Sequence, residues 1–176
     1  MIARGLKALG FTPGIDFNCH DDGEGPYIKD WLSNEPQPEM DDILAAAEEF
    51  ELTNAKAAAS AAISKASEDV RLKVAPYINY MDTEYQVLAS QADAYVAANR
   101  PENPVGLSML VQSAEDSGRT VSEEADLIRA KRDAYIALLN ATRSLRRRGQ
   151  AAIESASDVE TIHSVRDEYV AQLASL

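Results

Sequence analysis

Residues 17–40 read FNCHDDGEGPYIKDWLSNEPQPEM, and this stretch decides the fold of the first third of the chain. Two runs that can be extended, GIDFNCHD (14–21) and PYIKDWL (26–32), flank the turn sequence DDGEGP. Glycine supplies positive φ in such turns, and Pro26 ends this one. Pro36 and Pro38 then make a short stiff linker, and acidic residues follow at a helix start. The stretch predicts an acidic β-hairpin that leads into a helix.

The same stretch holds the only Cys and the only Trp, so it is a candidate for a metal or catalytic site. Cys19, His20 and the two acids after them are adjacent, and neighbours in a strand point to opposite faces. No second Cys or His pair follows at zinc spacing. The calcium-loop pattern fails because Lys29 stands where the bidentate Glu is required. No serine lies in G-x-S-x-G. We therefore expect no metal site, no cofactor and no enzymatic activity.

Charge is spread unevenly along the 176 residues, whose net charge is −12. Residues 1–53 contain twelve Asp and Glu but three Lys and Arg, a balance of −9. This acidity serves either solubility or a basic partner surface. It argues against nucleic acid and anionic membranes, because both require basic surface. No apolar run approaches the roughly 18–20 residues of a membrane span, and MIARGLKALGF lacks the continuous apolar region of a signal peptide. We expect a soluble cytoplasmic protein or a part of a larger assembly.

Helical patterns dominate the rest of the chain. Residues 39–75 read as one helix with an alanine-rich middle, which permits close approach of a neighbouring helix. Pro76 starts or kinks the next helix. Its apolar residues are spaced alternately three and four apart, as in a heptad seam: Ile78, Met81, Tyr85, Leu88, Ala92 and Tyr95. This pattern fits a short coiled coil or an amphipathic helix in an intramolecular bundle.

The C-terminal part reads as a small helical unit. RPENPVG marks a boundary near 100–106, and a short helix follows that Gly118 closes. Thr120 and Glu123 form a capping box for a long helix that is expected to end at Arg148, before Gly149. Ser157 and Glu160 form a second box for the last helix. The prediction is a mainly α protein with an N-terminal β-hairpin module over 1–38, a long helical segment over 39–100 and a C-terminal helical unit over 105–176.

One basic cluster stands out in this acidic chain: Arg143, Arg146, Arg147 and Arg148. Three interpretations were kept: cations that stabilise a helix C-terminus, a contact with a partner or another subunit, and a grip on a phosphate backbone.

The order of these elements resembles a known family. The Trp-containing strand GPYIKDWLSN, the linker EPQPEM and the Ala/Glu-rich helix DDILAAAEEFE are similar to bacteriophage tail fibre assembly proteins and related small tail-fibre-associated proteins. In the second half, YQVLASQADAYVAA, the joint RPENPVG and the segment SMLVQSAEDSGRTVSEEADLIRAKRDAYIALLNATRSLRRRGQAAIESA also look phage-like. The resemblance covers most of the chain as a pattern of elements.

The resemblance implies a non-enzymatic protein that binds a tail fibre or another tail protein, as an assembly chaperone or adaptor. The alternative is a structural virion component of the tail that oligomerises through its helices. Either role predicts a location in the host cytoplasm during assembly or in the virion tail, and we expect a homo-oligomer. The residues predicted to contact a partner are Phe17, Tyr27, Trp31, Ile78, Met81, Tyr85, Leu88, Tyr95 and the four arginines named above. If the apolar residues belong to the core instead, substitution by alanine should cost roughly 2–5 kcal/mol of folding stability. It should then cause no specific defect in partner binding.

Overall fold

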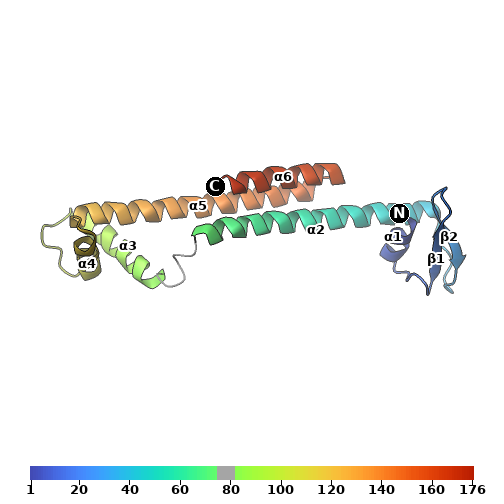
Figure 1. Cartoon of the computed structure of the whole chain (residues 1–176), viewed down its shortest axis with the longest axis horizontal. Coiled ribbons are helices and arrows are strands. Elements are labelled where there is room, and N and C mark those ends of the chain that lie inside the picture. Colours follow the sequence, from blue (N-terminus) through green and yellow to red (C-terminus); the bar gives the residue numbers. More distant parts are fainter. Residues whose placement is uncertain (75–81) are drawn as a thin grey trace. The chain divides into compact units, whose positions relative to one another are not determined.

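The computed structural model describes residues 1–74 and 82–176 (Figure 1). In these residues the chain forms six helices and one two-stranded sheet, which confirms a mainly α protein with an N-terminal hairpin. The elements in chain order are α1 (Ile2–Ala8), β1 (Phe17–Asp21), β2 (Pro26–Trp31), α2 (Met40–Val74), α3 (Asp82–Ala97), α4 (Ser108–Ser117), α5 (Val121–Ser155) and α6 (Val159–Ala174).

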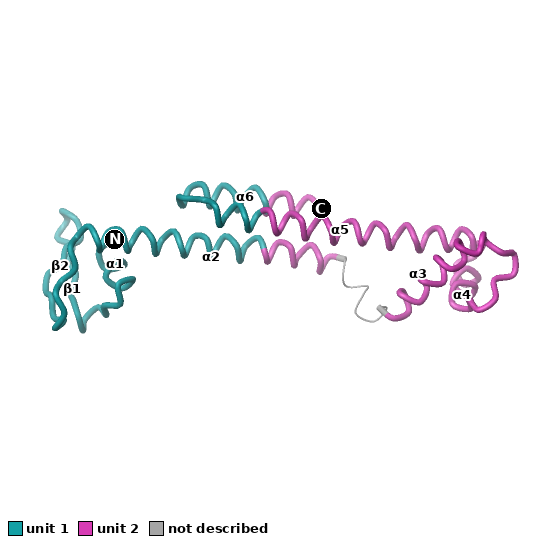
Figure 2. The backbone as a smooth tube through the Cα atoms, turned by 180° about the vertical axis from the view of Figure 1, so that it is seen from behind, with its two compact units in different colours: residues 1–63, 149–169 teal, residues 64–148, 170–176 magenta. Residues whose placement is uncertain are grey.

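The chain divides into two compact units (Figure 2). The first unit comprises residues 1–63 and 149–169, and the second comprises residues 64–148 and 170–176. Helices α2, α5 and α6 each contribute residues to both units. The predicted division into segments 1–38, 39–100 and 105–176 stays a prediction.

The hairpin in the first unit is antiparallel, with Phe17 opposite Trp31 and Asp21 opposite Pro26. Its turn uses the glycines that the sequence pattern singled out, because Gly23 and Gly25 have φ of 100° and 118°. The Asp21 carboxylate accepts a hydrogen bond of 3.0 Å from the Gly23 amide and stabilises the turn locally.

A small apolar core joins the hairpin to α1 and α2. Its buried residues are Ile2, Leu6, Phe17 and Ile43, with Ala3, Phe11, Cys19, Ile28 and Trp31 packed around them. The Trp31 ring meets the Phe11 ring edge-on, with 4.9 Å between centroids. The Trp31 indole N–H donates a 2.8 Å hydrogen bond to the Glu35 carbonyl. Trp31 thereby anchors the start of the proline linker to the hairpin.

Helix α1 lies against α2 at a position where only glycine fits. A Cβ on Gly5 would lie 1.9 Å from the backbone oxygen of Ile43. No side-chain rotation relieves such an overlap, since the obstacle is backbone. The hydrogen on Gly5 therefore permits the contact that closes the small core.

A second glycine corrects the predicted end of the long helix. The local pattern predicted that the helix ends at Arg148, yet α5 continues through Gly149 to Ser155. Gly149 is buried, and a Cβ there would lie 2.8 Å from Ile63 Cδ1 on α2 and 2.9 Å from Tyr169 Cγ on α6. Glycine costs about 1 kcal/mol of helix propensity. Here it serves the close packing of three helices in the first unit rather than helix termination.

The second unit has its own core, formed by α3, α4 and the first part of α5. Its buried residues are Ala89, Ala92, Tyr95, Leu110, Ala125 and Ile128. Leu88 packs against this cluster, so the described part of the heptad seam lies inside the unit. Ile78, Met81 and the kink predicted at Pro76 lie outside the described residues.

Helix boundaries in the C-terminal part follow local rules, with one correction. Gly118 ends α4 in the left-handed region, with φ 65°, as predicted. The predicted capping box is present: the Thr120 amide donates to the Glu123 carboxylate at 2.9 Å, and the Glu123 amide donates to Thr120 Oγ1 at 3.2 Å. For the last helix the cap is Asp158, not Ser157, since Asp158 Oδ1 accepts the Thr161 amide at 2.7 Å.

The Gly5 contact yields a direct test. Gly5→Ala should lower the free energy of unfolding by about 1–3 kcal/mol, because the new methyl overlaps a backbone carbonyl that cannot rotate away. Urea denaturation measures this change, and fluorescence of the single Trp reports whether the core around Trp31 loosens. Lys7→Ala, on the same helix but exposed, is the control and should leave both readouts near the wild-type values. Wild-type stability in Gly5→Ala would contradict the close approach.

Candidate functional site

The first unit carries a groove between the end of α1 and the first turns of α2. Five of the residues that line it are apolar: Leu9, Phe11, Pro38, Ala45 and Ala46. Its volume is about 430 Å³. Leu9 is 42% exposed although it is a large apolar residue. We call this feature the α1–α2 groove, and it offers apolar surface that the described part of the chain does not cover.

Two carboxylates border the α1–α2 groove. Asp42 and Glu49 line it together with Ala45 and Ala46. The four residues stand at positions i, i+3, i+4 and i+7 of α2, so they form one stripe of the helix. Asp42 and Glu49 are exposed, and neither forms an ion pair within residues 1–74 and 82–176. The stripe thus presents small apolar residues between two unpaired negative charges.

A second hollow in the first unit differs in its charges. It has a volume of about 350 Å³ and is lined by Phe50, Asn54, Val159 and the pair Arg4 and Glu51. Arg4 and Glu51 are bonded to each other. Its charged groups therefore already have partners, which sets it apart from the α1–α2 groove.

The hairpin aromatics predicted to contact a partner take different positions. Phe17 is 1% exposed and belongs to the core of the first unit, so its burial corrects the expectation that it offers contact surface. Trp31 is half-buried in the same core. Tyr27 is 40% exposed and remains available. Sequence reasoning missed the exposed Leu9 and the alanine pair of α2. The i, i+3, i+4, i+7 spacing from Asp42 to Glu49 was the signal that could have found the α2 side.

Cys19 and His20 are adjacent on β1. No group of three or more His, Cys, Asp or Glu side chains that could hold a metal ion occurs in the described parts of the chain. The His20 ring instead meets the Tyr27 ring edge-on, with 6.0 Å between centroids. Burial raises the pKa of the Cys19 thiol, and a raised pKa disfavours the nucleophilic thiolate.

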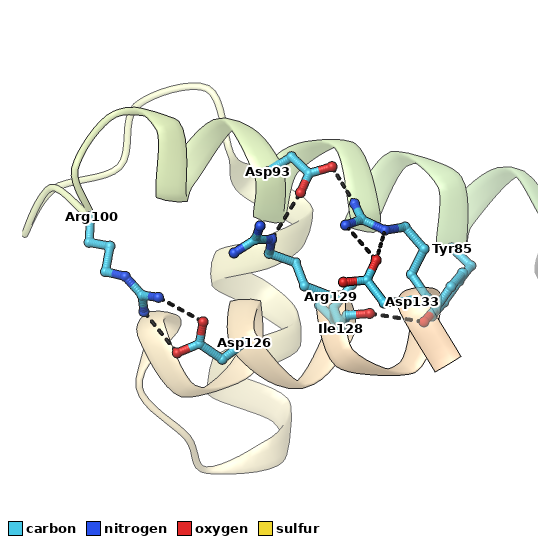
Figure 3. A network of polar contacts seen from close by, with 8 residues as sticks. Tyr85, Asp93, Arg100, Asp126, Ile128, Arg129 and Asp133 are labelled. Atoms are coloured by element: carbon cyan, nitrogen blue, oxygen red, sulfur yellow. Dashed lines mark hydrogen bonds and ion pairs between the residues drawn. The ribbon is translucent and has the colours of Figure 1, made fainter. Parts of the chain in front are cut away.

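In the second unit a polar network ties α3, and the turn that follows it, to α5 (Figure 3). Asp93 accepts hydrogen bonds from Arg129, at 3.0 Å, and from Arg132. Arg100 forms a bidentate pair with Asp126 at 2.7 and 2.9 Å, and this bonding lowers the pKa of the Asp126 carboxyl. These charges face one another, so the network has a structural role.

Two further predicted contact residues are used inside the second unit. The Tyr85 hydroxyl donates a 3.1 Å hydrogen bond to the Ile128 carbonyl on α5 (Figure 3). Tyr95 is 5% exposed within the core of this unit. Together with the packing of Leu88, these positions favour the core alternative for the described part of the seam, and its contact with a partner stays a prediction.

The arginine cluster lies within α5, not at its end. Arg143, Arg147 and Arg148 are exposed, and Arg146 is half-buried with its Nε lacking a hydrogen-bond partner in the structure. Because α5 continues to Ser155, stabilisation of a helix C-terminus no longer explains the cluster. No ion pair involves these four arginines within the described residues. The contact with an acidic partner or another subunit remains a prediction.

Comparison with known proteins adds one finding to this geometry. Residues 10–55 match the model of the XkdW protein family. The match covers about a quarter of the chain, namely the hairpin, the proline linker and the first turns of α2. The matched segment includes all the residues that line the α1–α2 groove except Leu9. It supports a phage-associated protein. No curated protein and no solved structure matches the chain.

Within the described residues, no helix has the length and apolar character that crossing a membrane requires.

Glu124, at the start of α5, carries a buried carboxylate. The residue is 6% exposed. Burial raises the pKa of this carboxyl, but hydrogen bonds from Arg119, Ser113 and Ser117 outweigh the effect and leave the pKa below its ordinary value. The Arg119 contact is 2.8 Å and the Ser113 contact is 2.8 Å. A carboxylate held in its charged form is not poised to donate a proton, so Glu124 fastens α4 to α5.

The lowered pKa of Glu124 predicts a pH-dependent effect. Above the pKa of the unfolded chain the charged carboxylate stabilises the fold, and this contribution is lost as the pH falls through the lower pKa of the folded state. Glu124→Gln should cost about 1–2 kcal/mol at pH 7, because the bonding to half-exposed Arg119 is partly screened by solvent. The difference should shrink as the pH falls below the ordinary pKa of Glu, about 4.3, measured by urea denaturation at pH 7 and at a series of acidic pH values. A pH-independent difference would contradict this account.

Proposed function

We propose that the protein is a non-enzymatic, phage tail-associated protein that binds a tail fibre or another tail protein, as an assembly chaperone or adaptor. The observation that carries the proposal is the coincidence of two features in residues 10–55. This segment matches a phage-related family, and it contains most of the α1–α2 groove.

The chemistry of the first unit supports contact rather than catalysis. Its carboxylates around the groove are exposed, and proton transfer at neutral pH usually requires a carboxyl whose pKa burial has raised. Apolar surface bordered by charge is instead typical of protein recognition, where the apolar part contributes affinity and the charges contribute specificity. The absence of enzymatic activity is part of the proposal.

The charge and the exposed apolar surface of the two units support different roles for them in this proposal. The first unit is acidic and presents apolar surface at Leu9 and Tyr27. The second unit pairs several of its carboxylates with its own arginines, among them Asp93, Asp126 and Glu124. We assign recognition of the tail protein to the first unit. In this proposal the protein acts in the host cytoplasm during tail assembly.

A second candidate function is a structural component of the virion tail that oligomerises through its helices. The unpaired arginines of α5 favour it, because a cationic helix face is stabilised by acidic groups of another molecule. The acidic first unit of a neighbouring copy has the complementary charge. In this case the protein remains in the particle as a homo-oligomer.

Co-expression with the tail proteins of the same phage tests the proposal. The tagged chain should co-purify with one defined tail protein, and that tail protein should lose solubility when the chain is omitted. A chain that binds none of the tail proteins, and whose omission leaves all of them soluble, would refute the proposed function.

Purified virions separate the two candidates. Quantitative mass spectrometry should not detect an assembly chaperone in them, whereas a structural component should be present in a fixed copy number. Detection in a fixed copy number would replace the chaperone role with the structural one.

A further inference from the structure

We propose that the α1–α2 groove binds an amphipathic helix of the partner protein that carries Lys or Arg at positions i and i+7 and large aliphatic residues at i+3 and i+4. This inference rests on the proposed function and specifies the chemistry of the partner segment. Neither the family match nor the sequence pattern assigns such a ligand.

The floor of the groove sets the apolar part of the ligand. Ala45 and Ala46 are small, so another backbone can approach α2 closely at this point. Leu9, Phe11 and Pro38 contribute further apolar lining to the groove. A volume of about 430 Å³ lies within the range of pockets that bury apolar groups. Aliphatic side chains on adjacent turns of a helix would remove this surface from water.

The two acidic residues at the groove, Asp42 and Glu49, favour a ligand that carries basic residues. Asp42 and Glu49 stand seven residues apart on α2, which places them about 10 Å apart along the helix axis. Basic residues at i and i+7 of a helix that runs beside α2 have the same spacing. Lys and Arg also cover apolar surface with their long stems while they keep the charge in water. The ligand therefore needs both charges and the aliphatic pair between them.

The carboxylates of Asp42 and Glu49 are available to pair with basic groups of another molecule. Three carboxylates in the second unit, those of Asp93, Asp126 and Glu124, have arginine partners within the chain. Asp42 and Glu49 lack such a partner in the described residues and flank an uncovered apolar strip. Additional exposed acids, Glu39, Asp41 and Glu48, lie on the same part of the chain. Their combined potential attracts a basic segment and repels an acidic one.

The test uses the full chain labelled with ¹⁵N and synthetic helical peptides of about 14 residues, roughly 20 Å long. The probe peptide carries Lys at i and i+7 and Leu at i+3 and i+4. One control peptide replaces both Leu by Ser, and the other replaces both Lys by Glu. The probe should cause saturable chemical-shift changes centred on Leu9, Phe11, Ala45 and Ala46. Each control peptide should bind at least about tenfold more weakly.

A pair of charge-matched variants locates the interaction on the chain. Asp42→Lys combined with Glu49→Lys should abolish binding of the Lys peptide and create binding of the Glu peptide. Glu68→Lys combined with Glu84→Lys makes the same change of net charge at exposed helix positions that do not line the groove. This control should change the affinity for the Lys peptide by less than about twofold.

Three outcomes would overturn the inference. Equal weakening by both variants would show a general attraction to an acidic chain. Full affinity of the Ser peptide would show that the apolar floor is not used. A dimer in sedimentation experiments that Asp42→Lys and Glu49→Lys dissociate would show that the groove holds a second copy of the chain.

The proposed function and the groove inference fail in different ways. If the chain co-purifies with a tail protein but does not bind the probe peptide, the proposed function stands and the inferred ligand is wrong. A chain that binds the peptide at the groove, yet associates with no tail protein, keeps the ligand chemistry and loses the proposed function.

Discussion

The first unit depends on close approach of helices at positions that carry no side chain. At Gly5 the hydrogen of glycine faces the backbone oxygen of Ile43, and at Gly149 it faces Ile63 and Tyr169. Aromatic residues make up only 6% of the chain, and the buried residues on these helices are mainly Ala and Ile. Small side chains bury little area each, so their helices gain enough contact only if they lie very near each other. Glycine at these contact positions makes that distance accessible.

The same constraint shapes the surface. Where α1 docks on α2 through Gly5, the chain that leaves α1 brings Leu9 and Phe11 beside the alanines of the next α2 face. A groove results because one face of α2 is occupied by α1 and the adjacent face is bordered but not filled. The core contact and the proposed recognition surface are therefore two consequences of one helix packing.

The two units differ in how some of their carboxylates are paired with arginines. In the second unit Asp93 and Asp126 are paired with arginines, and the buried Glu124 is held charged by three donors. In the first unit Asp42 and Glu49, at the groove, have no such partners in the described residues. Arg143, Arg146, Arg147 and Arg148, on the α5 segment of the second unit, are likewise without an ion pair in the described residues. Unpaired charges of both signs in one chain are compatible with contacts between molecules, and this pattern gives the adaptor and the structural component a common physical basis. The match of residues 10–55 to a phage-related family directs both candidates towards phage assembly.

Local rules made the hairpin, the helical content, the Thr120 capping box and the Gly118 helix end predictable, because each depends on residues within a few positions of one another. Gly149 shows where such rules stop. A glycine after four arginines reads as a helix end, and only the presence of Ile63 and Tyr169 beside it explains why α5 continues. The groove is of the same kind, since Leu9 and Ala45 are far apart in sequence and meet only once α1 has docked. The sequence by itself determined the elements and their caps, and the tertiary structure decided which faces are buried and which remain open, because burial depends on neighbours that no local pattern names.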